Sequence, residues 1–276
     1  MFSPFSQQTT PTIPESTMET LHSSEFYDRL ARLFDVMTDW QGRLALEMPF
    51  LLRTLDRHRV RTLLDTACGT GWHAITLAQK GYTAAGCDAS PQMIERARAN
   101  ADKAQVEVRF EVADFCRLDK FSETFDAVLC LGNSLPHLLS QEALLEAMRQ
   151  MRGKLHEGGV LILHNLNYDM RMKKKPRFFA ANGNDEALIW RFADYGPKFI
   201  TFHTALFERK MGDARQETSS WSVQVNSTLQ RPLLQKDLDE ALARAGFGTL
   251  QHFGGLDGST FEKENSGDLV IVALAQ

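Results

Sequence analysis

The sequence is poor in the features that bind metals or cross membranes. It has only four cysteines in 276 residues, and no two of them have the spacing of a CxxC redox pair or of a metal site. We therefore expect no bound metal and interpret the cysteines as small buried thiols. No apolar run approaches the roughly 18 residues that a membrane span needs. These absences argue against a membrane-spanning protein and against a metalloprotein.

An excess of positive charge is also missing. Lys and Arg total 31 against 35 Asp and Glu, which gives a formal net charge of -4 and a pI near 6.1. This balance disfavours a general electrostatic grip on nucleic acid or on an anionic membrane, and we expect neither as a partner. Residues 1–20 lack the basic start and the apolar stretch of a signal peptide, so the predicted location is cytoplasmic.

The patterns that are present divide the chain into successive parts. The first residues are rich in Ser, Thr, Pro and Gln, which is typical of disorder, and apolar residues at helical spacing follow. Short apolar strands then alternate with helices, before a stretch with alternating patterns and turn signals. The predicted parts are, in order, a disordered tail 1–20 and one domain 21–276, which comprises a helical cap 21–60, a binding core 61–169, an inserted β lid 170–231 and a C-terminal helix with strands 232–276.

The core pattern predicts the fold class. Five strands alternating with helices are typical of βαβ units and a parallel sheet. With two C-terminal strands added, we expect an α/β fold with a Rossmann-like, mostly parallel seven-stranded sheet and helices on both faces. The lid is expected to hold three antiparallel strands, and the basic run Arg171–Arg177 is expected to be a solvated loop. The predicted strands are Thr62–Asp65, Tyr82–Cys87, Val106–Val112, Phe125–Leu131 and Val160–His164 in the core, Ala187–Tyr195, Lys198–Arg209 and Glu217–Leu229 in the lid, and Phe247–Phe253 and Asp268–Ala275 at the end.

Acidic side chains stand at the ends of three successive predicted strands, where ligands of open parallel sheets bind. Asp65 precedes the turn that contains Gly69 and Gly71; an acid there repels a pyrophosphate but suits an ammonium or sulfonium group. Asp88 can accept hydrogen bonds from both ribose hydroxyls, and Asp114 can accept one from the exocyclic amine of adenine. Together they point to S-adenosylmethionine as cofactor, with S-adenosylhomocysteine as product, and not to NAD(H).

A family resemblance rests on five segments of the sequence. They are LLDTACGTG (63–71), GCDAS (86–90), VADF (112–115), FDAVLCLGNSLPHL (125–138) and GGVLILHNLNYD (158–169). With these segments the chain resembles the class I S-adenosylmethionine-dependent methyltransferases, and among them the glycine/sarcosine N-methyltransferase group. The likeness is strong over about residues 25–170 and weaker through the lid and the C-terminal strands.

The resemblance implies a set of cofactor contacts. Arg43 on the cap corresponds to an arginine that holds the carboxylate of the methionine moiety, and Tyr27 to a tyrosine near the sulfonium. Asp88 is implied to bind the ribose, and Asp114 the adenine. The full implied set is Tyr27, Arg43, Asp65, Ala67, Gly69, Gly71, Asp88, Ala89, Asp114, Phe115, Leu131 and Asn133.

The acceptor side is implied to lie beyond strands four and five. The expected acceptor pocket consists of His137, Leu166, Asn167 and Tyr168. Methyl transfer from a sulfonium needs alignment and exclusion of water, and no dedicated nucleophile or metal. A general base is needed only for a protonated acceptor, and His137, Tyr168 and His203 are the candidates.

One position departs from the pattern of glycine-methylating relatives. Leu166 stands where they carry an arginine that grips the carboxylate of the acceptor, and a neutral side chain cannot form that pair. We therefore expect a small, neutral or amine-bearing acceptor and little activity on glycine or sarcosine. The alternative is that a lid cation, Arg171 or Arg191, takes over this role.

The leading hypothesis is an S-adenosylmethionine-dependent methyltransferase that methylates a nitrogen of a small molecule by direct in-line transfer. The alternatives are O- or S-methylation of a small metabolite, and an S-adenosylmethionine-binding protein without catalysis. An NAD(P)-dependent oxidoreductase is a further alternative. A nucleic-acid methyltransferase is disfavoured because residues 133–136 read Asn-Ser-Leu-Pro in place of an Asn/Asp-Pro-Pro-aromatic motif.

Overall fold

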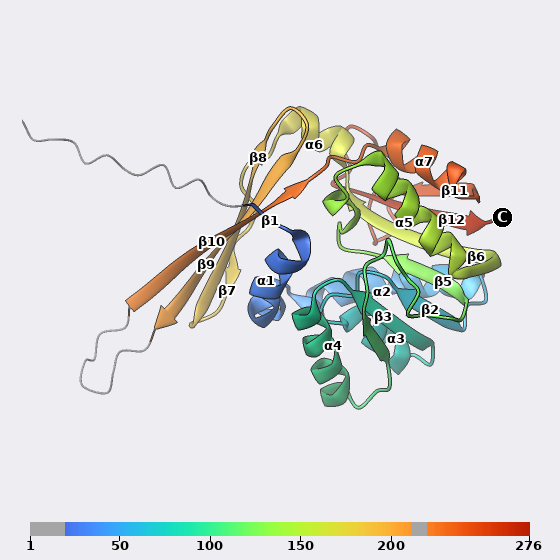
Figure 1. Ribbon diagram of the computed structural model, residues 1–276, viewed down its shortest axis with the longest axis horizontal. Helices are drawn as coiled ribbons and strands as arrows, with labels where there is room; N and C mark the ends of the chain where they lie inside the picture. Colours follow the sequence, from blue (N-terminus) through green and yellow to red (C-terminus); the bar gives the residue numbers. More distant parts are fainter. Residues whose placement is uncertain (1–19, 211–219) are drawn as a thin grey trace, which may run out of the picture.

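The computed structural model describes residues 20–210 and 220–276, and two sheets organise this part of the chain (Figure 1). The predicted tail 1–20 lies outside the described residues, except for Thr20. The described helices are α1 (Ser23–Met37), α2 (Trp40–Arg57), α3 (Trp72–Gln79), α4 (Pro91–Ala104), α5 (Gln141–Gly153), α6 (Tyr168–Lys174) and α7 (Gln235–Arg244), with a 3₁₀ turn η1 (Leu135–His137) before α5.

The larger sheet has seven strands in the order β11-β12-β6-β5-β2-β3-β4. Strands β6, β5, β2, β3 and β4 pair in parallel, and β12 is antiparallel to both of its neighbours. This arrangement confirms the predicted Rossmann-like, mostly parallel sheet. The strands are β2 (Thr62–Asp65), β3 (Thr83–Asp88), β4 (Arg109–Val112), β5 (Phe125–Cys130), β6 (Leu155–Leu166), β11 (Phe247–Phe253) and β12 (Asp268–Ala275).

Helices cover both faces of this sheet, as the alternating pattern predicts. On one face α2, α3 and α4 bury residues such as Leu51, Ile75 and Ile94, and on the other α5 and α7 bury Met148 and Leu242. Each such side chain contributes about 1.5–3 kcal/mol through removal of its apolar surface from water. Helix α2 therefore belongs to the core layers, and of the two N-terminal helices α1 packs between the two sheets (Figure 1).

Two strands of the larger sheet begin well away from their predicted first residues, and pairing explains both differences. Strand β4 begins at Arg109 and not at Val106, because it is an edge strand whose pairing with β3 starts where Ala85 meets Arg109. Strand β6 already begins at Leu155, because Leu155 pairs with Phe125 at the start of β5. Tertiary pairing thus sets strand length where the local pattern is ambiguous.

The smaller sheet contains the antiparallel segment that the sequence predicts after strand five, as β8, β9 and β10, and adds two short strands that were not predicted, β1 and β7. Its order is β1-β10-β9-β8-β7, and β1 joins β10 in parallel. Helix α1 packs against it, with Phe26 and Leu30 in contact with the cluster that holds Ile189 and Leu206. Its strands are β1 (Thr20–Leu21), β7 (Asn182–Gly183), β8 (Ala187–Tyr195), β9 (Ile200–Lys210) and β10 (Ser220–Gln230). We call β7–β10 together with α6 the lid.

The prediction of a solvated loop for Arg171–Arg177 was wrong for its first half. Residues 168–174 form helix α6, which Asn167 caps by accepting a hydrogen bond from the Met170 backbone N–H at 3.3 Å. Arg171 on this helix lies over the ring of Phe179, with 5.2 Å between the guanidinium carbon and the ring centroid. Within residues 20–210 and 220–276, no helix combines the length and apolar character that crossing a membrane requires.

Candidate active site

Two glycines shape the turn between β2 and α3. Gly69 and Gly71 both have left-handed backbone, with φ of 53° and 86°. A Cβ atom on Gly71 would lie 2.8 Å from Cζ of Phe110 and 3.0 Å from Cβ of Ala97, so this glycine permits close packing of α3 on its neighbours. At Gly69 the nearest atom would belong to Phe34, at 3.7 Å. The backbone at Gly69 therefore leaves room for a ligand at the ends of the strands.

Asp88 is the last residue of β3, and its carboxylate is hydrogen-bonded to this turn. Its Oδ2 accepts a hydrogen bond from the Gly69 backbone N–H at 3.0 Å, and its Oδ1 accepts one from Ser90 N–H at 2.9 Å. Each oxygen keeps a further lone pair that can accept from a ribose hydroxyl. Burial and the charges of Asp28 and Asp114 raise the pKa of Asp88 to about 6, against the opposing effect of the two hydrogen bonds. Additional donors from a ligand favour the ionised carboxylate.

Asp65, at the end of β2, is a buried acid with a free oxygen. Its side chain is 1% exposed, and Oδ1 accepts only a long hydrogen bond, 3.4 Å, from Ala67 N–H. Oδ2 has no hydrogen-bond partner among the described residues. Burial raises the pKa of Asp65 to about 7, with a further contribution from the charge of Asp88. Because a buried unpaired carboxylate is costly, this position favours a ligand that brings a cation.

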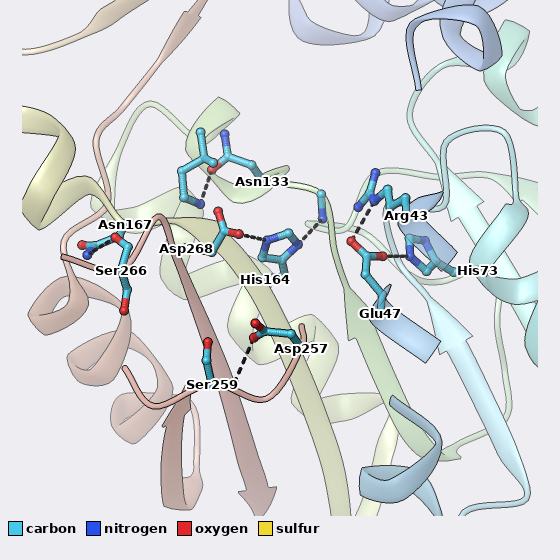
Figure 2. Close-up of polar contacts among 12 residues, drawn as sticks. Arg43, Glu47, His73, Asn133, His164, Asn167, Asp257, Ser259, Ser266 and Asp268 are labelled. Atoms are coloured by element: carbon cyan, nitrogen blue, oxygen red, sulfur yellow. Dashed lines mark hydrogen bonds and ion pairs between the residues drawn. The ribbon is translucent and has the colours of Figure 1, made fainter. Parts of the chain in front are cut away.

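Arg43 is fixed by a buried acid (Figure 2). Its Nε donates to Glu47 Oε1 at 2.8 Å, and His73 Nε2 donates to Glu47 Oε2 at 2.6 Å. Burial opposes ionisation of Glu47, but the hydrogen bond from His73 and the charge of Arg43 hold its pKa at about 2. One terminal nitrogen of Arg43 lies 3.7 Å from the position of a Cβ on Gly132. The outer edge of the guanidinium thus remains available for a ligand carboxylate.

The predicted adenine contacts surround the end of β4. Asp114 is exposed and accepts a hydrogen bond from Cys116 N–H at 2.7 Å, beside a hollow of about 280 Å³ that Val112 also lines. Ala89 is half-buried after β3, and half-buried Phe115 packs against the core. Leu131 and Ala67 line a small cavity together with Gly69 and Asp88. The structure therefore brings the predicted cofactor residues to one edge of the sheet.

These residues fit S-adenosylmethionine, because the orphaned Asp65 oxygen, the Asp88 carboxylate and the outer edge of Arg43 match its cationic, ribose and carboxylate groups. The cavity at the strand ends has only about 80 Å³, which is much smaller than this cofactor. Helix α1 closes over it: Asp28 accepts hydrogen bonds from Ser90 Oγ and Gln92 N–H, and Asp35 accepts one from Thr70 Oγ1. These hydrogen bonds fix α1 against the β2–α3 turn and the start of α4.

A second, larger cavity of about 700 Å³ lies between the lid, the cap helices and the ends of β5 and β6. Tyr27, Phe34, Arg43 and Gly132 line both this cavity and the smaller one. The two cavities therefore meet at these four residues. A cofactor on one side and an acceptor on the other can approach each other there.

Of the four residues predicted for the acceptor pocket, Leu166 and Tyr168 line the larger cavity, whereas His137 and Asn167 do not. Leu166, Tyr168 and Asn133 line it, and Tyr168 accepts a hydrogen bond from Asn133 Nδ2 at 3.1 Å while donating to Gln230 Oε1 at 3.3 Å. Placing Asn167 in the acceptor pocket was wrong. Its side chain is fully buried and donates to the carbonyl oxygens of residues 263 and 266, because it caps α6 and anchors the preceding turn.

The two histidines predicted as bases are placed away from this cavity. His137 is not among its lining residues; its Nε2 lies 3.1 Å from the Tyr27 hydroxyl, and burial lowers the pKa of His137 to about 4. His203 is on β9, where strand alternation turns Phe202 into the cavity and His203 to the other face, stacked on Phe192. Its role as a base was therefore a wrong expectation, and His137 acts at most through Tyr27.

Sequence reasoning missed several residues of the site. Glu47 follows Arg43 by four positions on one helix, which is a readable spacing for an ion pair. His73, which completes that pair, follows the Gly-rich turn and gives no such signal. Phe34 and Gln230 enter the larger cavity from opposite ends of the chain, so only the folded structure shows them.

The fold and the strand-end site together define an S-adenosylmethionine-dependent methyltransferase. A family model described as a methyltransferase domain matches residues 63–159. The structure of an S-adenosylmethionine-dependent methyltransferase from Clostridium acetobutylicum superposes with a TM-score of 0.74 at 17% identity, over 90% of this chain and 98% of that one. At this identity the likeness concerns the fold.

Sequence relatives give the particular family. The glycine/sarcosine N-methyltransferase of Parasynechococcus marenigrum (strain WH8102) is 33% identical over 202 residues, 72% of this chain and 71% of that protein. The enzyme of the same description from Aphanothece halophytica is 32% identical over 171 residues, 60% of this chain and 64% of that protein. The chain belongs to the family of these methyltransferases.

Proton release should accompany cofactor binding. Because the pKa of Asp65 is raised to about 7, the free protein holds a proton on this carboxyl group at pH 6. The ammonium group of S-adenosylhomocysteine favours loss of that proton. Affinity for S-adenosylhomocysteine should therefore rise with pH up to about 7 and then level off. Titration calorimetry at pH 6 in two buffers of different ionisation enthalpy measures the released protons. The release should shrink in Asp65→Asn; an unchanged release in that variant contradicts this assignment.

Proposed function

We propose that this enzyme transfers the methyl group of S-adenosylmethionine directly to the nitrogen of a small amine held in the 700 Å³ cavity. The observation that carries the proposal is a cavity that meets the cofactor site at Tyr27 and Arg43 and whose described lining has no histidine and no acid other than the exposed Asp39. A neutral amine has its own lone pair and needs only alignment behind the methyl carbon. The relatives named as N-methyltransferases support the same chemistry.

The chain's own residues bind and orient the reactants. Asp88 accepts hydrogen bonds from the ribose, Arg43 pairs with the methionine carboxylate, and Asp65 faces the positive charge. S-adenosylmethionine supplies an electrophilic methyl carbon on a sulfonium. Helix α1 and the lid exclude water from the junction of the two cavities, which removes competing hydration from the amine.

The titratable groups near the junction are poor bases. Burial lowers the pKa of His137 to about 4 and raises the pKa of the Tyr27 and Tyr168 hydroxyls. Tyr168 also uses its hydroxyl in two hydrogen bonds. An alcohol or thiol acceptor has to lose a proton for efficient transfer, whereas a neutral amine does not. The geometry therefore favours N-methylation over O- or S-methylation.

An acceptor screen with S-adenosylhomocysteine release as readout tests this proposal. We expect turnover with primary or secondary amines, little with glycine or sarcosine, and none with matched alcohols or thiols. Leu166→Arg, at the cavity wall, should raise glycine turnover, because it restores a cation for the carboxylate at the end of β6. Efficient glycine turnover by the wild type, or a preference for alcohols over amines, would overturn it.

A further inference from the structure

Two arginines of the lid line the acceptor cavity, and neither forms an ion pair with an acid in the described part of the chain. Arg171 on α6 and Arg191 on β8 both line it. The Nε atom of each is buried and has no hydrogen-bond partner among the described residues. The one acidic side chain among the lining residues is Asp39, which is exposed and caps α2 through Gly42 N–H at 3.0 Å. The inner cavity is therefore electropositive.

The buried positive charge of Arg191 favours binding of an anion. Guanidinium groups stay charged in proteins, and a buried charge is costly without a counterion. Burial lowers the pKa of Arg191, and the nearby charge of Arg43 lowers it further. Arg43 has its own acid in Glu47, whereas the lid arginines lack one. A ligand that brings negative charge into the cavity relieves this cost.

The arrangement of the arginines suits a planar anion. Arg171 lies over the ring of Phe179 at 5.2 Å, and Arg191 extends from the face of β8 that also turns Ala193 toward the cavity. Planar guanidinium forks match the two oxygens of a carboxylate. Leu166 on the neighbouring wall offers no such pairing, so a carboxylate in this cavity has the lid arginines as its partners.

The size and lining of the cavity indicate an acceptor larger than glycine. About 700 Å³ is within the range of pockets that enclose drug-sized ligands. The walls are largely apolar, and burial of apolar ligand surface against them favours binding. The apolar lining includes Leu30, Phe34, Met37, Phe179, Ile200 and Phe202. Glycine, whose side chain is a hydrogen atom, leaves most of these surfaces uncovered.

We propose that Arg171 and Arg191 form the anion subsite of the acceptor cavity, and that the acceptor is an amine carrying both a carboxylate and an apolar group. This proposal rests on the proposed function and names its substrate class. Of the two possibilities that follow from Leu166, this proposal selects the one in which lid cations pair with the carboxylate of the acceptor. The lid then supplies the charge that glycine-methylating relatives are implied to supply from the end of strand five.

Binding of matched acids and amides tests the subsite. The probes are L-phenylalanine and L-leucine against L-phenylalaninamide and L-leucinamide, titrated calorimetrically into the full chain saturated with S-adenosylhomocysteine. The acids should bind about ten- to a hundredfold more tightly than the amides, since each charge-assisted pair is lost in the amide. Arg191→Gln and Arg171→Gln should each reduce this preference, and Arg191→Lys should retain part of it.

Arg177→Gln is the matched control, because Arg177 is exposed, pairs with Asp194 at 3.0 Å and does not line the cavity. It should keep the full preference for acids. Unchanged affinity for S-adenosylhomocysteine shows that each variant is folded. Equal binding of acids and amides by the wild type, absence of binding by either, or a preference that survives in both glutamine variants overturns the subsite.

These titrations, combined with turnover of the same probes in the presence of S-adenosylmethionine, separate this proposal from the proposed function. An acid preference that depends on Arg191, without S-adenosylhomocysteine formation from any amine, supports the subsite and contradicts N-methylation. Equal turnover of acids and amides supports N-methylation and overturns the subsite.

Discussion

Replacing Asp88 by alanine should weaken the binding of S-adenosylhomocysteine by about 1.5–3 kcal/mol, which is ten- to a hundredfold or slightly more. The carboxylate is the strand-end acceptor for the ribose, and it also fixes the Gly69 N–H at 3.0 Å and the Ser90 N–H at 2.9 Å. Alanine removes the ribose contact and frees both amides at once. Calorimetric titration of wild type and variant measures the loss.

Asp126→Ala is the control for this substitution. Asp126 also fixes two backbone N–H groups, those of Arg61 and Thr62, both at 2.7 Å, but at the opposite end of the strands. Its loss should lower the melting temperature without changing the affinity for S-adenosylhomocysteine. Equal effects of the two substitutions on affinity would show that Asp88 acts through the fold alone.

Gly71→Ala should destabilise the protein by about 2–5 kcal/mol. The new Cβ would lie 2.8 Å from the Phe110 ring and 3.0 Å from Cβ of Ala97. Overpacking of this kind costs about 1–3 kcal/mol, and left-handed backbone adds about 1–2 kcal/mol for a residue with a Cβ. Since Gly71 begins α3 beside the cofactor turn, S-adenosylhomocysteine affinity should fall as well. Chemical unfolding of the variant measures the loss of stability.

Gly81→Ala separates the two contributions. Gly81 has a similar φ of 94°, but a Cβ there would meet no atom within 4 Å. This variant should lose only the conformational part, about 1–2 kcal/mol. Adding Phe110→Leu to Gly71→Ala should recover part of the packing loss. If both alanine variants lose the same stability, the contact with Phe110 is not the cause.

The sequence was most informative where the backbone repeats. Alternating strands and helices predicted the seven-stranded sheet, and the acids Asp65, Asp88 and Asp114 could be placed together because parallel strands end at one edge. The cofactor was inferable from these positions, since each acid follows its strand directly. Glu47 was overlooked although its spacing from Arg43 is regular, because an i,i+4 pair on a helix surface ordinarily carries no function.

The acceptor side was less predictable. Asn167 and His203 are chemically suited to a pocket, yet one caps α6 and the other lies on the outer face of β9. A strand places neighbouring residues on opposite faces, so a shift by one position exchanges Phe202 for His203. Local sequence does not determine which face of an inserted sheet packs against the rest of the protein.

The sequence by itself determined the fold class, the cofactor edge and the departure at Leu166, because these depend on periodicity and on residues adjacent to strand ends. Only the tertiary structure decided what surrounds the acceptor. The large cavity is formed by α1, α2 and the lid, which are distant from one another in the chain. Their packing turns Arg171 and Arg191 toward the cavity, where neither forms an ion pair with an acid in the described part of the chain. The charge of the pocket thus depends on how the lid packs against the rest of the protein, which no local sequence pattern determines.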